Sequence, residues 1–149
     1  MASDPVRLRP MMRSDAGCCR TLLTQLGYEM TEAELERRFD EVSLAPEHSL
    51  FVAEAAGRVV GLMHVFARPA LENPREAVVQ AIVVDEAFRD IGIGRHLMTA
   101  AERWGSGRRC RSIVLSSNIT RGLAHAFYAA LGYRVSATSL VLRKELPPG

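Results

Sequence analysis

The stretch Val83–Leu97, VVDEAFRDIGIGRHL, decides how the second half of this chain folds, because it joins a buried strand to a helix through a glycine turn. Gly92 and Gly94 have no side chains, so the backbone there can adopt positive φ and approach a ligand closely. The first amides of a helix have no partner within the helix and carry partial positive charge, which attracts phosphate. Arg89 and Arg95 add positive charge beside them. The stretch therefore predicts a phosphate-binding turn at the start of a helix.

The same residues disfavour two common nucleotide-binding loops. A dinucleotide-binding fingerprint needs a third glycine where Leu97 stands, and a P-loop needs a Gly-Lys-Ser/Thr triplet that the chain lacks. A tight loop that binds nothing is the remaining alternative for two isolated glycines.

Two amphipathic helices are predicted in the N-terminal part of the chain. The first covers residues 14–26 and stops at Gly27. The second begins at Thr31, because Thr31 and Glu34 have the spacing of a capping box and apolar residues then recur at helical intervals.

Strands follow in the middle of the chain. Residues 50–53 and 59–66 are typical of a hairpin that turns at Ala56-Gly57, and residues 77–84 of a long buried strand. After the glycine turn we expect a helix over residues 94–104, ended by Gly105-Ser106-Gly107.

The remaining elements are a strand over residues 112–116, a helix over 120–131 and a closing strand over 139–142. This order predicts one α/β (α+β) domain over residues 1–149, with a mixed central sheet and helices on both faces.

The composition limits the classes of function. The 149 residues, 48% hydrophobic and 24% charged, are typical of one globular domain. With 19 basic and 17 acidic residues, the net charge of +2 does not indicate nucleic-acid binding. No apolar run approaches the roughly 20 residues of a membrane span, and the N-terminus lacks the hydrophobic segment of a signal peptide. We expect a cytoplasmic protein that binds neither nucleic acid nor membrane.

Cysteine and histidine spacing predicts no metal site. Cys18, Cys19 and Cys110 form no C-x-x-C pair, and the four histidines are scattered without ligand spacing.

The order Arg89-x-x-Gly92-x-Gly94, soon after the strand Ile82–Val84, resembles the acyl-CoA signature of the GNAT superfamily of N-acetyltransferases. The resemblance covers most of the chain, from the two N-terminal helices to the closing strand. It implies an enzyme that uses acetyl-CoA as cosubstrate, on a fold whose splayed central strands admit pantetheine. The strand before the turn would pair with pantetheine, and the amides of the turn would hold the pyrophosphate. The cofactor-binding residues implied by the resemblance are Ile82, Val83, Val84, Arg89, Asp90, Ile91, Gly92, Ile93, Gly94, Arg95, Asn118 and Tyr128.

Asn118 and Tyr128 match the second half of the family pattern, in which the Asn contacts pantetheine and the Tyr faces the thioester sulfur. A tyrosine, with a pKa near about 10, is neutral at pH 7 and can protonate a thiolate whose pKa is near about 8.5. The resemblance thus implies direct acetyl transfer to a primary amine, with Tyr128 as the catalytic general acid. The alternatives are that Tyr128 only lies at the amphipathic edge of its helix and that Asn118 is an ordinary helix N-cap or turn residue.

The sequence departs from the family at Gln80, where many relatives carry a carboxylate suited to accept the proton of the amine. Glutamine cannot act as a base at neutral pH. A water relay, another residue or an amine that arrives neutral would have to replace it. His64, on the neighbouring predicted strand, has a suitable ordinary pKa near about 6.5, although a hydrogen-bonded strand histidine is the alternative. His125, one helical turn before Tyr128, is a candidate for orienting it.

Other functions stay open at this point, as does the identity of the amine acceptor, a small molecule or a protein. A non-catalytic acetyl-CoA-binding regulatory module is favoured by the loss of the carboxylate at Gln80 and opposed by Tyr128. The basic cluster Arg108, Arg109 and Arg111 has no aromatic platform beside it, which disfavours single-stranded nucleic acid. A homodimer through the closing strand is plausible, because sheet edges invite pairing.

Overall fold

A computed structural model of the chain describes residues 5–117 and 122–149. The chain forms two compact units, Met1–Ser116 and Ser117–Gly149, each of which is described by itself. The elements of the first unit are β1 (Arg7–Pro10), η1 (Arg13–Asp15), α1 (Ala16–Leu26), α2 (Glu32–Ser43), β2 (His48–Ala55), β3 (Arg58–Arg68), β4 (Glu76–Val84), η2 (Glu86–Phe88), α3 (Ile93–Gly107) and β5 (Ser112–Leu115). The second unit contains α4 (Gly122–Ala130).

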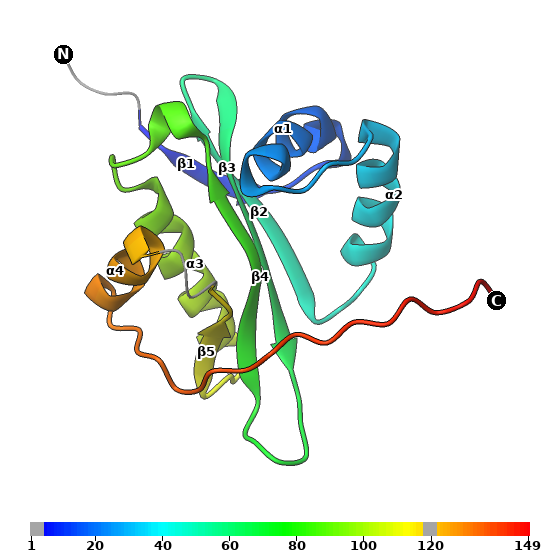
Figure 1. Ribbon diagram of the computed structural model, residues 1–149. Helices are drawn as coiled ribbons and strands as arrows, with labels where there is room; N and C mark the ends of the chain where they lie inside the picture. The colour runs from blue at the N-terminus through cyan, green and yellow to red at the C-terminus, as the bar shows by residue number, and fades with distance from the viewer. Residues whose placement is uncertain (1–4, 118–121) are drawn as a thin grey trace. The chain divides into compact units, whose positions relative to one another are not determined.

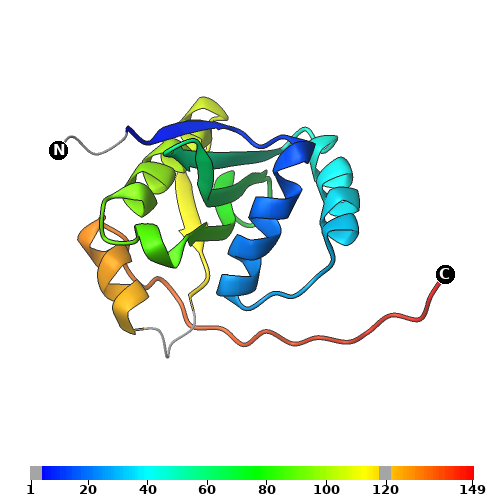
Figure 2. The same cartoon turned by 90° about the horizontal axis from the view of Figure 1, so that it is seen from above.

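The first unit is built on a mixed sheet with strand order β1-β2-β3-β4-β5. The first four strands run antiparallel to their neighbours, and β5 runs parallel to β4. α1 and α2 cover one face of this sheet and α3 covers the other (Figures 1 and 2). The predicted mixed sheet with helices on both faces is confirmed.

Apolar residues of the helices fill the core on each face. Cys19 and Leu22 of α1 and Leu35 of α2 pack with Val52 and Leu62 of the sheet. On the opposite face, the fully buried residues of α3 lie against β3 and β4; they are Ile93, Leu97, Met98 and Ala101. Burial of such side chains stabilises the fold by roughly 1.5–3 kcal/mol each.

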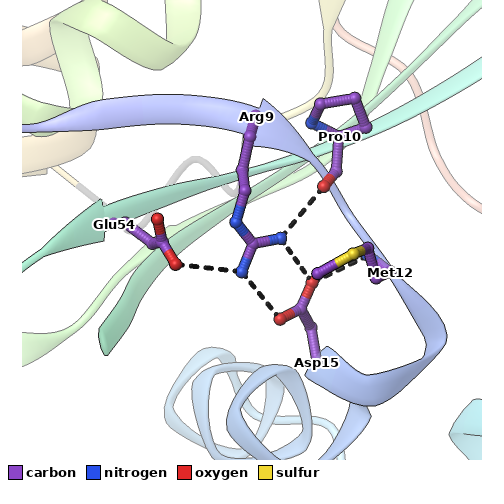
Figure 3. Close-up of polar contacts among 5 residues, drawn as sticks. All are labelled: Arg9, Pro10, Met12, Asp15 and Glu54. Atoms are coloured by element: carbon purple, nitrogen blue, oxygen red, sulfur yellow. Dashed lines mark hydrogen bonds and ion pairs between the residues drawn. The ribbon is translucent and has the colours of Figure 1, made fainter. Parts of the chain in front are cut away.

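A partly buried ionic network holds the segment that leads into α1 (Figure 3). Arg9 of β1 donates to both carboxylate oxygens of Asp15, at 2.8 and 2.9 Å, and to Glu54 of β2 at 3.2 Å. The Met12 amide donates to Asp15 at 2.7 Å. The Arg9 guanidinium and the Met12 amide hold the pKa of Asp15 below its ordinary value, because both stabilise the charged carboxylate. The network ties the edge strand, the neighbouring strand and the first helix together.

β1 was not predicted, because four residues ending in a proline carry too little pattern to identify a strand. Proline is tolerated at the end of an edge strand, and pairing of Leu8 with Ala53 and of Arg9 with Val52 creates β1.

The expected end of α3 at Gly105 was wrong. Gly105 is buried inside the helix, where an added Cβ would lie 3.0 Å from the Cβ of Ala77, so the glycine serves close packing on β4. The helix instead continues to Gly107 with Arg108 as its C-cap, and the chain turns away at Arg109, whose φ of 63° lies in the left-handed region. There the Cys110 amide donates to the Gly105 carbonyl at 2.9 Å, as in a Schellman motif.

The strand predicted over residues 139–142 is not formed, since residues 133–149 contain no helix or strand. Leu140, Val141 and Leu142 are 86%, 82% and 88% exposed. Apolar alternation produces a strand only where another strand supplies hydrogen bonds, and nothing in the local pattern guarantees that partner.

Within the described ranges, no helix is both long and apolar enough to cross a membrane. Those ranges also contain no cluster of three or more side chains that could hold a metal ion.

Candidate active site

The site begins where β4 and β5 part. Their parallel pairing runs from Glu76 and Ser112 to Val79 and Leu115, whereas β4 continues to Val84. Residues 80–84 therefore extend beyond the last pair with β5, while their other edge stays paired with β3. This geometry leaves one side of the β4 backbone available to an extended ligand.

A β-bulge lies where this separation begins. His64 pairs with Ala81 and Val65 pairs with Val79, so Gln80 is the extra residue of β4. Gln80 is exposed. A bulge bends its strand and increases the local twist, and bulges are common beside active sites. The bulge thus marks the point at which β4 turns away from β5.

The predicted glycine turn follows β4 directly. Asp85 caps η2 by accepting a hydrogen bond from the Ala87 amide at 2.9 Å. Asp90 and Gly92 then adopt left-handed backbone conformations, with φ of 66° and 91°. Asp tolerates this region better than most residues, and at Gly92 a Cβ would meet nothing within 4 Å. The two left-handed residues turn the chain into α3.

The start of α3 is open. Gly92 is its N-cap residue and supplies no side-chain hydrogen bond. The first intrahelical bond at this end is donated by His96 to the Gly92 carbonyl, at 3.1 Å. The amides of Ile93, Gly94 and Arg95 precede that bond, so the helix directs three donors and its partial positive charge toward the turn. Such a helix start is suited to a phosphate or pyrophosphate group.

Two exposed arginines flank these amides. The Arg89 side chain folds back along the turn, where its Nε donates to the Val84 carbonyl at 3.2 Å. Arg95 lies in the first turn of α3 and is exposed. The turn therefore carries positive charge beyond that of the helix start alone.

The strand, turn and helix agree with a known family in order and in chain position. The model of the Acetyltransferase (GNAT) family matches residues 12–133. The chain belongs to this family. As a GNAT protein it is an N-acetyltransferase that uses acetyl-CoA as its cosubstrate.

Curated relatives of this GNAT chain include two named acetyltransferases. Glucosamine 6-phosphate N-acetyltransferase 1 of Oryza sativa subsp. japonica is 31% identical over 136 residues, covering 87% of this chain and 78% of the relative. Aminoglycoside N(6')-acetyltransferase type 1 of Salmonella typhimurium is 24% identical over 110 residues, covering 71% of this chain and 76% of the relative.

A solved structure shares the whole fold of this GNAT chain. Aminoglycoside N-acetyltransferase AAC(6')-Iy in complex with CoA superposes with a TM-score of 0.86 at 21% identity, covering 97% of this chain and 98% of that one.

The first unit brings together ten of the predicted cofactor-binding residues, on the end of β4, on the turn that follows it and at the start of α3. They are Ile82, Val83, Val84, Arg89, Asp90, Ile91, Gly92, Ile93, Gly94 and Arg95. Asn118 lies outside the described residues. Tyr128 lies on α4 in the second unit, where its ring contacts those of Phe127 and Tyr133 at centroid distances of 5.1 and 5.9 Å. The roles of all these residues stay predictions.

Sequence reasoning missed a residue that pairs with His64. His48 Nδ1 and His64 Nε2 are 2.8 Å apart in a hydrogen bond between β2 and β3. Counting strand residues from the turn at Ala56-Gly57 would place Ser49 opposite His64. A bulge at Val60 shifts the register, so Leu50 lies opposite His64 and His48 shares its face.

Proposed function

We infer that this acetyltransferase moves the acetyl group of acetyl-CoA directly to a primary amine, with the CoA bound along residues 82–84 and on the turn from Arg89 to Arg95. The observation that carries this inference is the coincidence of two features on one strand, turn and helix. β4 extends beyond its pairing with β5, and the helix that follows starts without a side-chain cap.

The residues present fit the chemistry of CoA. Pantetheine contains amide groups that can hydrogen-bond to an extended strand edge, as an added strand would. A pyrophosphate needs several donors and positive charge, which the open amides of α3 and the two flanking arginines supply. The thioester of acetyl-CoA provides an activated acetyl group, so the protein needs no nucleophile of its own.

The remaining chemistry is proton transfer, for which Tyr128 is the proposed acid. Departure of CoA produces a thiolate, and a neutral tyrosine hydroxyl is able to protonate it at pH 7. Backbone amides near the end of β4 are candidates for stabilising the oxygen that becomes negative during transfer.

The first acceptors to test are amino sugars. The two curated relatives carry the names of enzymes that acetylate aminoglycosides and glucosamine 6-phosphate, and both substrates present a primary amine on a sugar. A protein lysine or a peptide N-terminus belongs in the same panel as a distinct acceptor class.

The experiment combines acetyl-CoA calorimetry with a thiol-release assay over that amine panel. We expect saturable one-site binding and turnover with at least one amine. Tyr128→Phe should lower kcat about 100-fold or more while the Kd for acetyl-CoA changes less than about twofold. Tyr133→Phe is the matched control, because it removes a hydroxyl from the neighbouring ring and should leave kcat nearly unchanged.

Three results would contradict parts of this proposal. Unchanged turnover in Tyr128→Phe would remove that residue from the acid role. Binding of acetyl-CoA with no acetylation of any amine would favour a regulatory module. Absence of binding by the folded chain would overturn the proposed CoA site.

A further inference from the structure

We propose that His48 and His64 form a proton relay that accepts the proton of the acceptor amine, in the role that Gln80 cannot perform. This inference rests on the proposed function and deepens it by assigning the base.

The two rings form a connected pair on the sheet face that α1 and α2 cover. The hydrogen bond joins Nδ1 of His48 to Nε2 of His64 at 2.8 Å. The ring of Phe66 stacks on His48, with a centroid distance of 4.9 Å and an interplanar angle of 14°. Stacking and hydrogen bonding fix the orientation of both imidazoles, which is what a relay requires.

The pair lies beside the point where β4 leaves β5. His64 pairs with Ala81, the residue directly after the bulged Gln80. In the proposed function the thioester approaches along residues 82–84, so an amine that attacks it must come close to this bulge. His64 is therefore on β3, the strand next to the reacting end of the site, and His48 is on β2, one strand further away.

One nitrogen of His64 is open to the acceptor. Its Nε2 is used in the bond to His48, and no buried side-chain nitrogen of the described residues lacks a hydrogen-bond partner. Since the Nδ1 of His64 has no bond of its own among these residues, it must reach solvent. An exposed imidazole nitrogen without a hydrogen is a base.

The proton balance follows from that arrangement. In the resting pair, His64 Nε2 carries a proton and donates it to His48 Nδ1, so His64 Nδ1 has a free lone pair. The acceptor arrives as an ammonium ion, and one of its protons moves to His64 Nδ1 before the free amine attacks the thioester. The Nε2 proton of His64 moves to His48 Nδ1. His48 then releases its Nε2 proton to solvent. No oxidant or metal is needed, and His64 is neutral before and after the transfer.

The electrostatics explain why two histidines serve better than one. Burial, together with the neighbouring His48, lowers the pKa of His64 to about 4. A lone His64 would be a weak base, whereas the relay lets the positive charge settle on His48. Among the charged groups of this face, Arg68 on β3 and Glu76 on β4 neutralise one another at 2.7 Å. α1 and α2 pack this face with apolar residues, among them Leu26 and Phe39.

The test measures kcat/KM against pH for the full chain with an amine that the native protein acetylates. The kcat/KM of His64→Gln should be about 100-fold lower than that of the native chain at pH 7. The difference in kcat/KM between His64→Gln and the native chain should decrease as pH rises toward the pKa of the acceptor amine, because a free amine no longer needs a base before it attacks. The kcat/KM of His48→Gln should be about tenfold lower, since His64 is retained but has lost its proton acceptor. Arg68→Gln, a polar change on the same strand, should stay within about twofold.

A rescue variant separates a chemical role from a structural one. Adding Gln80→Glu to His64→Gln places a carboxylate at the exposed bulge. The double variant should have a kcat/KM at least tenfold higher than that of His64→Gln alone. Acetyl-CoA calorimetry on every variant should give an unchanged Kd.

The outcomes distinguish the relay from the proposed function. Suppose that the native chain acetylates the amine but that His64→Gln leaves kcat/KM unchanged, or lowers it equally at every pH with no recovery on adding Gln80→Glu. Either result would overturn the relay without contradicting acetyl transfer. Acetyl-CoA binding with no acetylation by the native chain would overturn the proposed function and the relay together.

Discussion

Two helices of the first unit begin in opposite ways. α2 is closed by its own side chains: Thr31 Oγ1 accepts from the Glu34 amide at 3.1 Å, and Glu34 accepts from the Thr31 amide at 3.4 Å. α3 begins at Gly92, which has no side chain to offer, and its first amides face the turn. η1, which leads directly into α1, begins with a related contact, because Asp15 accepts from the Met12 amide.

The difference between the starts of α2 and α3 shows where the folded chain lacks the stabilising contribution of a capping side chain. A capping side chain stabilises a helix by roughly 1 kcal/mol, and a glycine in its place contributes less to the folded chain. α2 and the η1–α1 segment pack on the sheet, and local side chains supply hydrogen bonds to amides at the starts of α2 and η1. α3 directs the same donors toward a place where an anionic ligand can supply the missing hydrogen bonds.

The largest expected effect is at the open start. Gly92→Glu introduces a side chain and a negative charge where we expect the pyrophosphate. The affinity for acetyl-CoA should fall about 100-fold, or roughly 2.8 kcal/mol, measured by calorimetry. Gly57→Glu is the matched control, because Gly57 also has positive φ (74°) with nothing within 4 Å of an added Cβ, but lies in the β2–β3 hairpin.

Equal affinity losses in the two glutamate variants would mean that backbone strain, not ligand contact, governs binding. Equal thermal stability with unequal affinity is the result that supports the open helix start as the CoA site.

The next effect concerns Asp15, at the junction of η1 and α1. Asp15→Asn removes the charge that pairs with Arg9 and should lower the free energy of unfolding by about 2–3 kcal/mol, measured by urea denaturation at pH 7. The affinity for acetyl-CoA should not change. An affinity that fell in parallel would show that the two helix starts are coupled.

The pH dependence of stability offers a second check on Asp15. Its folded pKa is lowered, so the carboxylate contributes stability that is fully present above its ordinary pKa near about 4. That contribution is lost as pH falls through the lower folded pKa. Below about pH 4 the native chain should therefore lose stability more steeply than Asp15→Asn. Parallel curves would contradict the assignment.

The smallest effect is expected at α2. Thr31→Ala removes the capping hydroxyl and should cost about 1 kcal/mol of unfolding free energy, with acetyl-CoA binding unchanged. Thr31→Ser, which keeps the hydroxyl, should recover most of that loss. A cost below about 0.3 kcal/mol in Thr31→Ala would mean that water replaces the cap fully.

The glycine turn and the caps could be predicted because their signals are local. Gly27 adopts φ of 107° at the end of α1, as its position after an apolar helix predicts. Thr31 and Glu34 form the expected capping box, and the strand before Asp85 ends where the turn begins. In each case the deciding residues lie within about four positions of one another.

Features that depend on distant partners escaped prediction. Gly105 looked like a helix stop, yet its role is set by Ala77, on a strand that precedes the helix. β1 exists through its pairing with β2, and residues 139–142 have the pattern of a strand without forming one. The local sequence pattern does not specify which strands form hydrogen bonds with one another or which elements pack closely together.

The sequence by itself determined the order of the elements from α1 to α4, the turn that opens α3 and the family to which the chain belongs, because each depends on short-range residue spacing. Only the tertiary structure decided which histidines meet. The bulge at Val60 shifts β2 by one residue against β3, and a one-residue shift moves every side chain to the opposite face of a sheet. That shift brings His48 to the face of His64, and the bulge at Gln80 places the pair beside the point where β4 departs from β5.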